Sequence, residues 1–268
     1  MSKKIGRNTY TLDKPIYVIG RANKTSQKEA DGPLGKYFDD VANDDTLGEE
    51  TFEKAERRLM EETVFHAISN ANKKEEEIDL FIGGDLLNQL VTTNYTARSY
   101  NIPFLGVYGA CSTMSESLII ASLILDGGGV NNIVCATGSH FSASERQFRN
   151  PLELGCQRQT YSQWTVTGMG AVVLSNVQRS RAKITQVSVG NVTDFGVVDI
   201  ANMGAAMAPA IAIIGLCGMI LPRISNTKIY SKGGKYSINN VCEIQLGSQQ
   251  NILLTFYYRI KIQIIWHK

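Results

Sequence analysis

Cys111 is the residue whose type and neighbours are best suited to chemistry. It follows an apolar strand expected over Pro103–Tyr108 through a Gly-Ala turn, and it precedes a nearly all-apolar helix expected over Ser112–Leu125. Unpaired N–H groups at a helix N-terminus favour negative charge and therefore the thiolate form of a cysteine. A free cysteine more often simply fills space in a core. Here the turn before the helix favours the interpretation that Cys111 lines a pocket.

His140 is the second candidate, because it follows a strand expected over Asn132–Thr137. Ligands of open α/β sheets collect beyond the carboxyl ends of the strands. A loop histidine that makes only local hydrogen bonds is an equally good interpretation. The other two histidines are His66, inside an expected helix, and His267, near the C-terminus. A nucleophilic cysteine needs a base and a group that stabilises charge on the substrate, so this scarcity weighs against strong catalysis.

Asp85 ends another expected strand, in IDLFIGGD. We expect it to face the same crevice as His140, beyond the carboxyl ends of the strands. A carboxylate there could orient a ligand, coordinate a cation or cap the next helix, and capping is the commonest role.

The cysteine pattern and the absent motifs limit the chemistry further. The five cysteines are odd in number, widely spaced and without a C-x-x-C pair, which argues against a disulfide framework or a zinc site. A reducing compartment fits this pattern best. The chain contains no Walker motif, H-E-x-x-H motif, EF-hand loop or G-x-S-x-G motif. We therefore expect no cofactor and no bound metal.

Alternating strands and helices must position these side chains. Their spacing predicts parallel β-α-β units, in the order β-α-β-α-β-α-β, followed by two strands with the hairpin character of an antiparallel edge. Besides the segments named above, the expected elements are a strand at Pro15–Gly20, helices at Thr51–Asn72 and Leu90–Tyr100, and the last two strands at Thr165–Ser175 and Ala182–Gly190.

The chain changes character near residue 210. Residues 211–268 contain seven basic residues and one acidic residue, a net charge of +6, whereas residues 1–210 have a net charge of −4. A basic β-rich module and a membrane anchor around Met203–Leu221 are two interpretations of this segment. The third, which its Ile, Lys, Asn and Tyr content favours, is the product of a shifted reading frame. The net charge of the whole chain, +2, gives no reason to expect nucleic acid as a partner.

Several phrases resemble a known family. KEADGPLGKYFDD, GGDLLNQLVTTNYTAR, IPFLGVYGACSTM, SHFSASERQFRNP and TVTGMGAVVLSN are similar to the stage V sporulation protein AD family of the thiolase-like superfamily. The resemblance covers most of residues 13–210, in order. It implies a thiolase-like αβαβα layered α/β fold, with the N-terminal half in residues 1–210 and the C-terminal half missing or replaced in residues 211–268. The chain would then be a truncated or frame-shifted copy.

The resemblance also implies a function, which is binding more than catalysis. The family binds dipicolinic acid within the system that takes calcium dipicolinate into the spore. It works on the cytoplasmic side of the developing spore, beside the inner spore membrane and its stage V sporulation membrane proteins. The implied ligand-binding residues are Lys28, Asp85, Cys111 and His140. A homodimer through Gly138–Gln163 is expected as well. The rival function is a thiolase-like acyltransferase that uses Cys111 as acyl carrier.

Overall fold

The computed structural model describes residues 3–5, 7–148 and 165–190, and the backbone of short strands beyond them. The helices, with η for 3₁₀, are α1 (Gln27–Ala30), η1 (Gly35–Tyr37), α2 (Phe52–Asn70), η2 (Glu75–Glu77), η3 (Asn88–Leu90), α3 (Val91–Ser99), η4 (Ala110–Ser112), α4 (Thr113–Gly127) and α5 (Phe141–Phe148). The strands are β1 (Lys3–Ile5), β2 (Thr9–Ser26), β3 (Asp40–Ala42), β4 (Leu80–Gly84), β5 (Phe104–Gly106), β6 (Asn132–Ser139), β7 (Gly168–Ser175), β8 (Ala182–Ser188), β9 (Val192–Thr193), β10 (Lys228–Ser231), β11 (Gly234–Ser237), β12 (Tyr257–Tyr258) and β13 (Lys261–Trp266).

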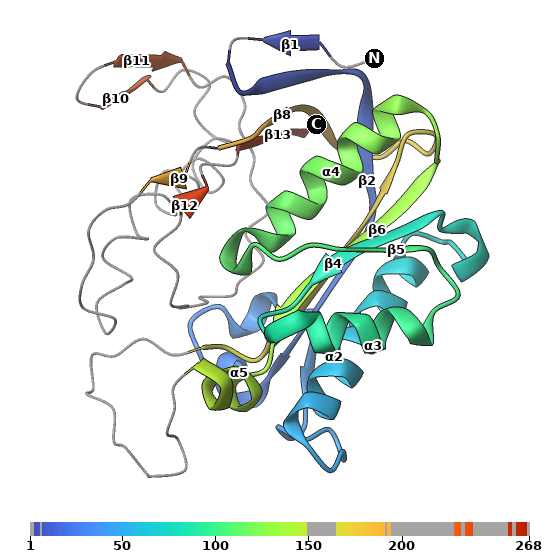
Figure 1. Cartoon of the computed structure of the whole chain (residues 1–268), viewed down its shortest axis with the longest axis vertical. Helices are drawn as coiled ribbons and strands as arrows, with labels where there is room; N and C mark the ends of the chain where they lie inside the picture. Colours follow the sequence, from blue (N-terminus) through green and yellow to red (C-terminus); the bar gives the residue numbers. More distant parts are fainter. Residues whose placement is uncertain are drawn as a thin grey trace.

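One mixed sheet organises the molecule. Its strand order is β13-β8-β2-β7-β6-β4-β5, and β1 and β3 also pair with β2. Strand β4 runs parallel to β5 and β6, whereas β7 is antiparallel to β6, and β2 is antiparallel to both β7 and β8. Helix α4 covers one face of this sheet, and α2 and α3 cover the other (Figure 1).

The expected hairpin of the last two strands is wrong. Strands β7 and β8 each pair with β2, which lies between them in the sheet. Strand β2 has 18 residues, far longer than the strand expected at Pro15–Gly20. Its ends are polar and its pairing shows register shifts, so the apolar run reveals only its middle. Alternation indicates that a segment is a strand, but it does not identify the partner strand.

Side chains of β6 alternate between two cores. Ile133 and Cys135 pack in the cluster that surrounds α4, whereas Val134 and Ala136 pack in the cluster around α2. Successive side chains of a strand point to opposite faces, so this sheet is buried on both sides. The result is a three-layer αβα arrangement.

The predicted helices are confirmed, with small shifts at their ends. Helix α2 lies within the range Thr51–Asn72, and Thr51 Oγ1 accepts the N–H of Lys54 at 3.3 Å as its N-cap. Helices α3 and α4 also match their expected ranges. Helix α5 was not predicted as an element, because it lies in the polar stretch that follows β6.

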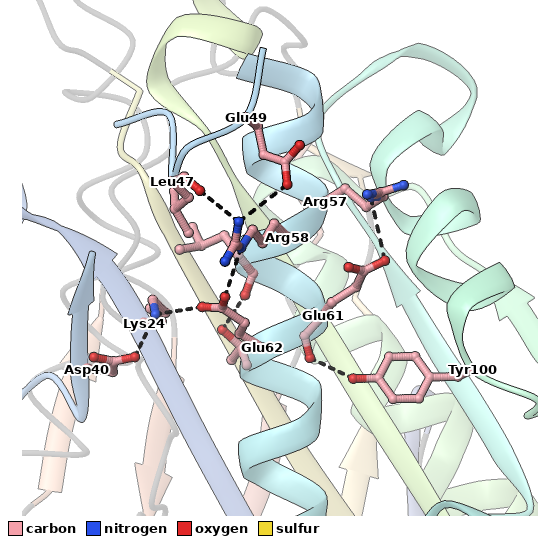
Figure 2. Close-up of polar contacts among 11 residues, drawn as sticks. Lys24, Asp40, Leu47, Glu49, Arg57, Arg58, Glu61, Glu62 and Tyr100 are labelled. Carbon is pink, nitrogen blue, oxygen red and sulfur yellow. Dashed lines mark hydrogen bonds and ion pairs between the residues drawn. The ribbon is translucent and has the colours of Figure 1, made fainter. Parts of the chain in front are cut away.

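A network of ion pairs and hydrogen bonds holds residues 40–47 against helix α2 (Figure 2). Lys24 Nζ lies 2.7 Å from a carboxylate oxygen of Asp40 and 2.7 Å from one of Glu62. Burial opposes the charge of Lys24, but its hydrogen bonds to the two carboxylates outweigh burial and raise its pKa. Arg58 Nη1 donates to the backbone oxygen of Leu47 at 2.9 Å, and Arg58 Nε donates to Glu62 at 3.1 Å. The segment that contains residues 40–47 is thereby held against α2.

Two expectations fall outside these elements. The change of character at residue 210 and the window Met203–Leu221 both lie outside the described residues. In the part of the chain that the structure describes, no helix has the length and apolar character needed to cross a membrane.

Candidate functional site

The four predicted site residues lie at one edge of the sheet. Asp85 and His140 directly follow the carboxyl ends of β4 and β6, which are parallel neighbours. Lys28 follows the end of β2, and Thr25 of that strand pairs with Gly168, which also pairs with Ser139 at the end of β6. Cys111 lies in η4, a few residues after the end of β5. The backbone positions of the four residues therefore lie at the edge that the sequence indicated, and their role in ligand binding stays a prediction.

The turn that carries Cys111 joins β5 to α4. Ala110 has a φ of +50°, a left-handed conformation that costs a non-glycine residue about 1 kcal/mol. Two hydrogen bonds fix the turn: Gly109 N–H donates to Thr113 Oγ1 at 3.2 Å, and Ser112 Oγ donates to the Gly109 oxygen at 2.8 Å. Because its hydroxyl points back in this way, Ser112 does not cap α4 with its side chain. The start of α4 therefore has no side-chain cap from Ser112, and its helix dipole favours a nearby negative charge.

Gly84 explains how close this turn comes to the sheet. A Cβ built on Gly84 would overlap the backbone oxygen of Val107 and crowd the side chain of Thr113 in the first turn of α4. Only glycine permits this approach. The end of β4 and the start of α4 are therefore packed directly against each other.

Asp85 caps α3 across a loop. Its Oδ1 accepts the N–H of Leu87 at 2.8 Å, and its Oδ2 accepts both the N–H and the hydroxyl of Thr93 at 2.6 Å. Thr93 belongs to the first turn of α3, whose N–H groups have no partner within the helix. Burial raises the pKa of Asp85, and the hydrogen bonds from Thr93 and Leu87 oppose this shift. Of the three roles that the sequence left open, the structure shows capping.

His140 is fully buried, and both ring nitrogens are engaged. Its Nε2 lies 2.6 Å from the backbone oxygen of Asp45, and its Nδ1 accepts the N–H of Ser142 at 3.2 Å. Only the neutral tautomer with the proton on Nε2 makes both bonds. The ring stacks on Phe52 of α2, with 5.2 Å between ring centroids. Burial lowers the pKa of His140, and the nearby Asp45 opposes this shift.

Lys28 lies on the surface beside the start of α5. Its Nζ is 4.2 Å from the ring centroid of Phe141, a cation–π contact. The backbone turn of Cys111 belongs to the α4 side of the sheet, whereas Asp85 and His140 contact residues of α3 and α2. The four residues thus share one edge of the sheet, but they contact different neighbouring residues.

Two carboxyl groups at this edge were missed by sequence reasoning. Glu56 of α2 is completely buried, and neither of its oxygens makes a hydrogen bond of good geometry to a described residue. Burial raises its pKa well above the ordinary value, and the charge of Asp85 adds to this shift. The sequence feature that could have revealed the burial of Glu56 is its position on the apolar face of α2, one turn after Phe52 and three residues before Leu59.

Glu116 is the second missed carboxyl, in the first turn of α4. Its Oε2 is buried and makes no hydrogen bond to any described residue. Burial raises the pKa of Glu116. The sequence feature that could have revealed Glu116 is that it is the only charged residue in the apolar segment Ser112–Leu125.

The described residues do not gather three or more His, Cys, Asp or Glu side chains in a group that could hold a metal ion.

Solved structures identify the class of fold. A CsyB variant complexed with CoA-SH superposes with a TM-score of 0.51 at 13% identity, over 69% of this chain and 63% of that chain. The 3-oxoacyl-[acyl-carrier-protein] synthase III of Aquifex aeolicus VF5 gives a TM-score of 0.47 at 18% identity, over 77% of this chain and 71% of that one. The fold is thiolase-like, as the sequence predicted.

Sequence comparison then gives the family. Residues 6–216 match the family model of stage V sporulation protein AD (SpoVAD). The stage V sporulation protein AD of Bacillus subtilis (strain 168) is 44% identical over 210 residues, which are 78% of this chain and 62% of that protein. The chain belongs to the SpoVAD family of sporulation proteins. It spans less than two thirds of the length of this relative.

Proposed function

We propose that this protein binds dipicolinate, beside the Cys111 turn, for the uptake of calcium dipicolinate into the spore. Membership of the SpoVAD family is the observation that carries the proposal. The protein would work at the inner spore membrane, on the cytoplasmic side of the developing spore. Its partners there would be the other stage V sporulation membrane proteins, and it would act as a homodimer.

The start of α4 supports an anionic ligand. Dipicolinate is a flat aromatic dianion, and a helix N-terminus attracts negative charge through its N–H groups. Ser112 does not occupy these groups with its side chain. The exposed Lys28, at the same edge of the sheet, adds a positive charge.

The state of His140 supports binding over catalysis. A base for Cys111 would need a free ring nitrogen, but His140 uses Nε2 for Asp45 and Nδ1 for Ser142. His66 lies on the exposed surface of α2. The described part of the chain therefore offers the thiol no histidine that is ready to accept its proton.

Calorimetric titration with dipicolinate tests the proposal. Benzene-1,3-dicarboxylate, which has the same charges on a ring without nitrogen, is the control ligand, and the full-length Bacillus subtilis protein is the control protein. We expect selective, reversible binding that survives Cys111→Ser. Binding by the relative but not by this chain would show that residues 1–210 do not form a complete site. Stoichiometric acylation of Cys111 by an acyl-CoA, detected by mass spectrometry, would instead support the acyltransferase.

A further inference from the structure

The carboxyl of Glu116 is folded back onto the turn that carries Cys111. A Cβ built on Gly109 would overlap both Glu116 Oε2 and Ser112 Oγ. The glycine of the Gly-Ala-Cys turn therefore leaves space for a carboxyl group. The carboxyl of Glu116 thus lies against the turn that contains Cys111, although the two residues are five positions apart in the sequence.

One oxygen of this carboxyl lacks the partners that normally hold a carboxylate. Its Oε2 is buried and makes no hydrogen bond to a described residue, and no ion pair joins Glu116 to a basic side chain among those residues. Glu116 as a whole is half-buried, but an oxygen of a carboxylate that is buried without a donor or a counter-charge is costly, and this cost favours the protonated form. The raised pKa of Glu116, caused by burial, agrees with this geometry.

Among the described residues, the charged and titratable groups around α4 do not reverse this preference. Of the elements packed on α4, β6 contributes the buried thiol of Cys135 and β2 contributes Tyr10 to the same cluster. Lys183 of β8 alternates with the buried Ala182 and Ile184 and so points to the other face of the sheet. At the far end of α4, Asp126 accepts the backbone N–H groups of residues 13 and 14.

We propose that Glu116 is a ligand-binding residue of this turn, and that its protonated carboxyl donates a hydrogen bond to one carboxylate of the ligand. The inference rests on the proposed function, because it assigns one more residue to the same site. An ionised Glu116 would repel a dianion at the start of α4 and would offset the helix dipole. A protonated Glu116 supplies a donor instead, and it binds the ligand together with one proton.

The pH dependence of dipicolinate binding tests this assignment. The carboxyl groups of the ligand have ordinary pKa values of about 4, so the ligand stays fully ionised above about pH 6. Titrations at a series of pH values from about 6 to about 8.5, with a chelator present to remove divalent cations, should show weaker binding as the pH rises. For one linked proton, the Kd rises by up to about tenfold per pH unit above the pKa of free Glu116.

Two variants and a control separate Glu116 from other groups. Glu116→Gln keeps a donor that needs no proton, so its Kd should change by less than about threefold over the same range. Glu76→Gln, on the exposed surface of η2, should keep the wild-type slope. Gly109→Ala displaces the carboxyl and should weaken binding at low pH, with thermal melts to confirm that the variant is folded.

Three results would overturn the assignment: a Glu116→Gln variant with the wild-type slope, a wild type that binds without any slope, or binding that requires calcium in the wild type but not in Glu116→Gln. If the wild type binds no dipicolinate at any pH, the proposed function fails, and this inference fails with it.

Discussion

The side chain of His140 holds the backbone of Asp45, a residue 95 positions earlier in the chain, with 2.6 Å between Nε2 and the carbonyl oxygen. Arg58 holds the same segment at Leu47. These two hydrogen bonds join the loop between β3 and α2 to helix α2, through Arg58, and to the end of β6, through His140. Of these two side chains, only the imidazole of His140 is of a type that titrates near neutral pH.

Acidification should loosen this loop. The pKa of His140 is lowered in the folded protein, so the unfolded chain binds the proton more readily. The contribution of His140 is complete above its ordinary pKa of 6.5 and declines as the pH falls below that value. The loss reaches at most about 1.4 kcal/mol per pH unit for one group. Thermal melts between about pH 8 and about pH 5.5 should show it.

Glutamine variants isolate this effect. Glutamine can still donate to the Asp45 oxygen but does not titrate, so His140→Gln should reduce the loss of stability below pH 6.5. His66→Gln, at an exposed position of α2, is the control variant. Equal profiles for wild type and His140→Gln would contradict the role of the imidazole.

Glu56→Gln should stabilise the protein at neutral pH. The pKa of Glu56 is raised in the folded state, so its contribution to stability is most favourable below the ordinary value of 4.5 and is lost as the pH rises above it. Glutamine removes this loss, and the gain in melting temperature over wild type should increase from about pH 5 to about pH 8. Glu76→Gln, at an exposed position of η2, is the control. A constant loss of stability in Glu56→Gln at every pH would show that the carboxylate is ionised and well bound.

Periodicity predicted much of the fold because local pattern and burial agree in the helices and in the central strands. Helix α2 and strands β4 and β6 appear where their apolar residues indicated them. The pairing of β7 and β8 with β2 could not be predicted, because partner choice depends on the whole sheet and not on either segment.

The sequence predicted the positions of Asp85 and His140 at strand ends, but not the contacts that their side chains make. Parallel strands end together, so Asp85 and His140 had to lie near each other. Their hydrogen bonds to Thr93 and Asp45 depend on loops whose paths no local pattern specifies. The burial of Glu56 likewise follows from how α2 packs on the sheet, and a single acidic residue in a helix does not reveal this.

Thr93→Val should destabilise the start of α3. The change removes the hydroxyl that donates to Asp85 at 2.6 Å but keeps the shape and the backbone N–H. Both residues are buried, and a hydrogen bond to a charged group contributes about 1.5–3 kcal/mol. Urea unfolding should show a loss in that range. Thr46→Val, which removes a similar bond to the exposed Asp44, should change little. Equal losses in the two variants would refute the capping role of Asp85.

Lys24→Met should cost more stability than the loss of a surface ion pair. The side chain of Lys24 is 14% exposed and lies between Asp40 and Glu62, so methionine leaves two carboxylates without their shared cation. Because both carboxylates are partly solvated, screening limits the expected loss in urea unfolding to about 1 kcal/mol. Lys54→Met, which removes an exposed i,i+4 pair with Glu50, is the matched control and should be neutral. The loss in Lys24→Met should also shrink as salt is added, because salt weakens the repulsion between the two remaining carboxylates. A neutral Lys24→Met variant would mean that the pairing of β3 with β2 and the contacts of Arg58 and His140 are sufficient to hold the segment from Asp40 to Leu47.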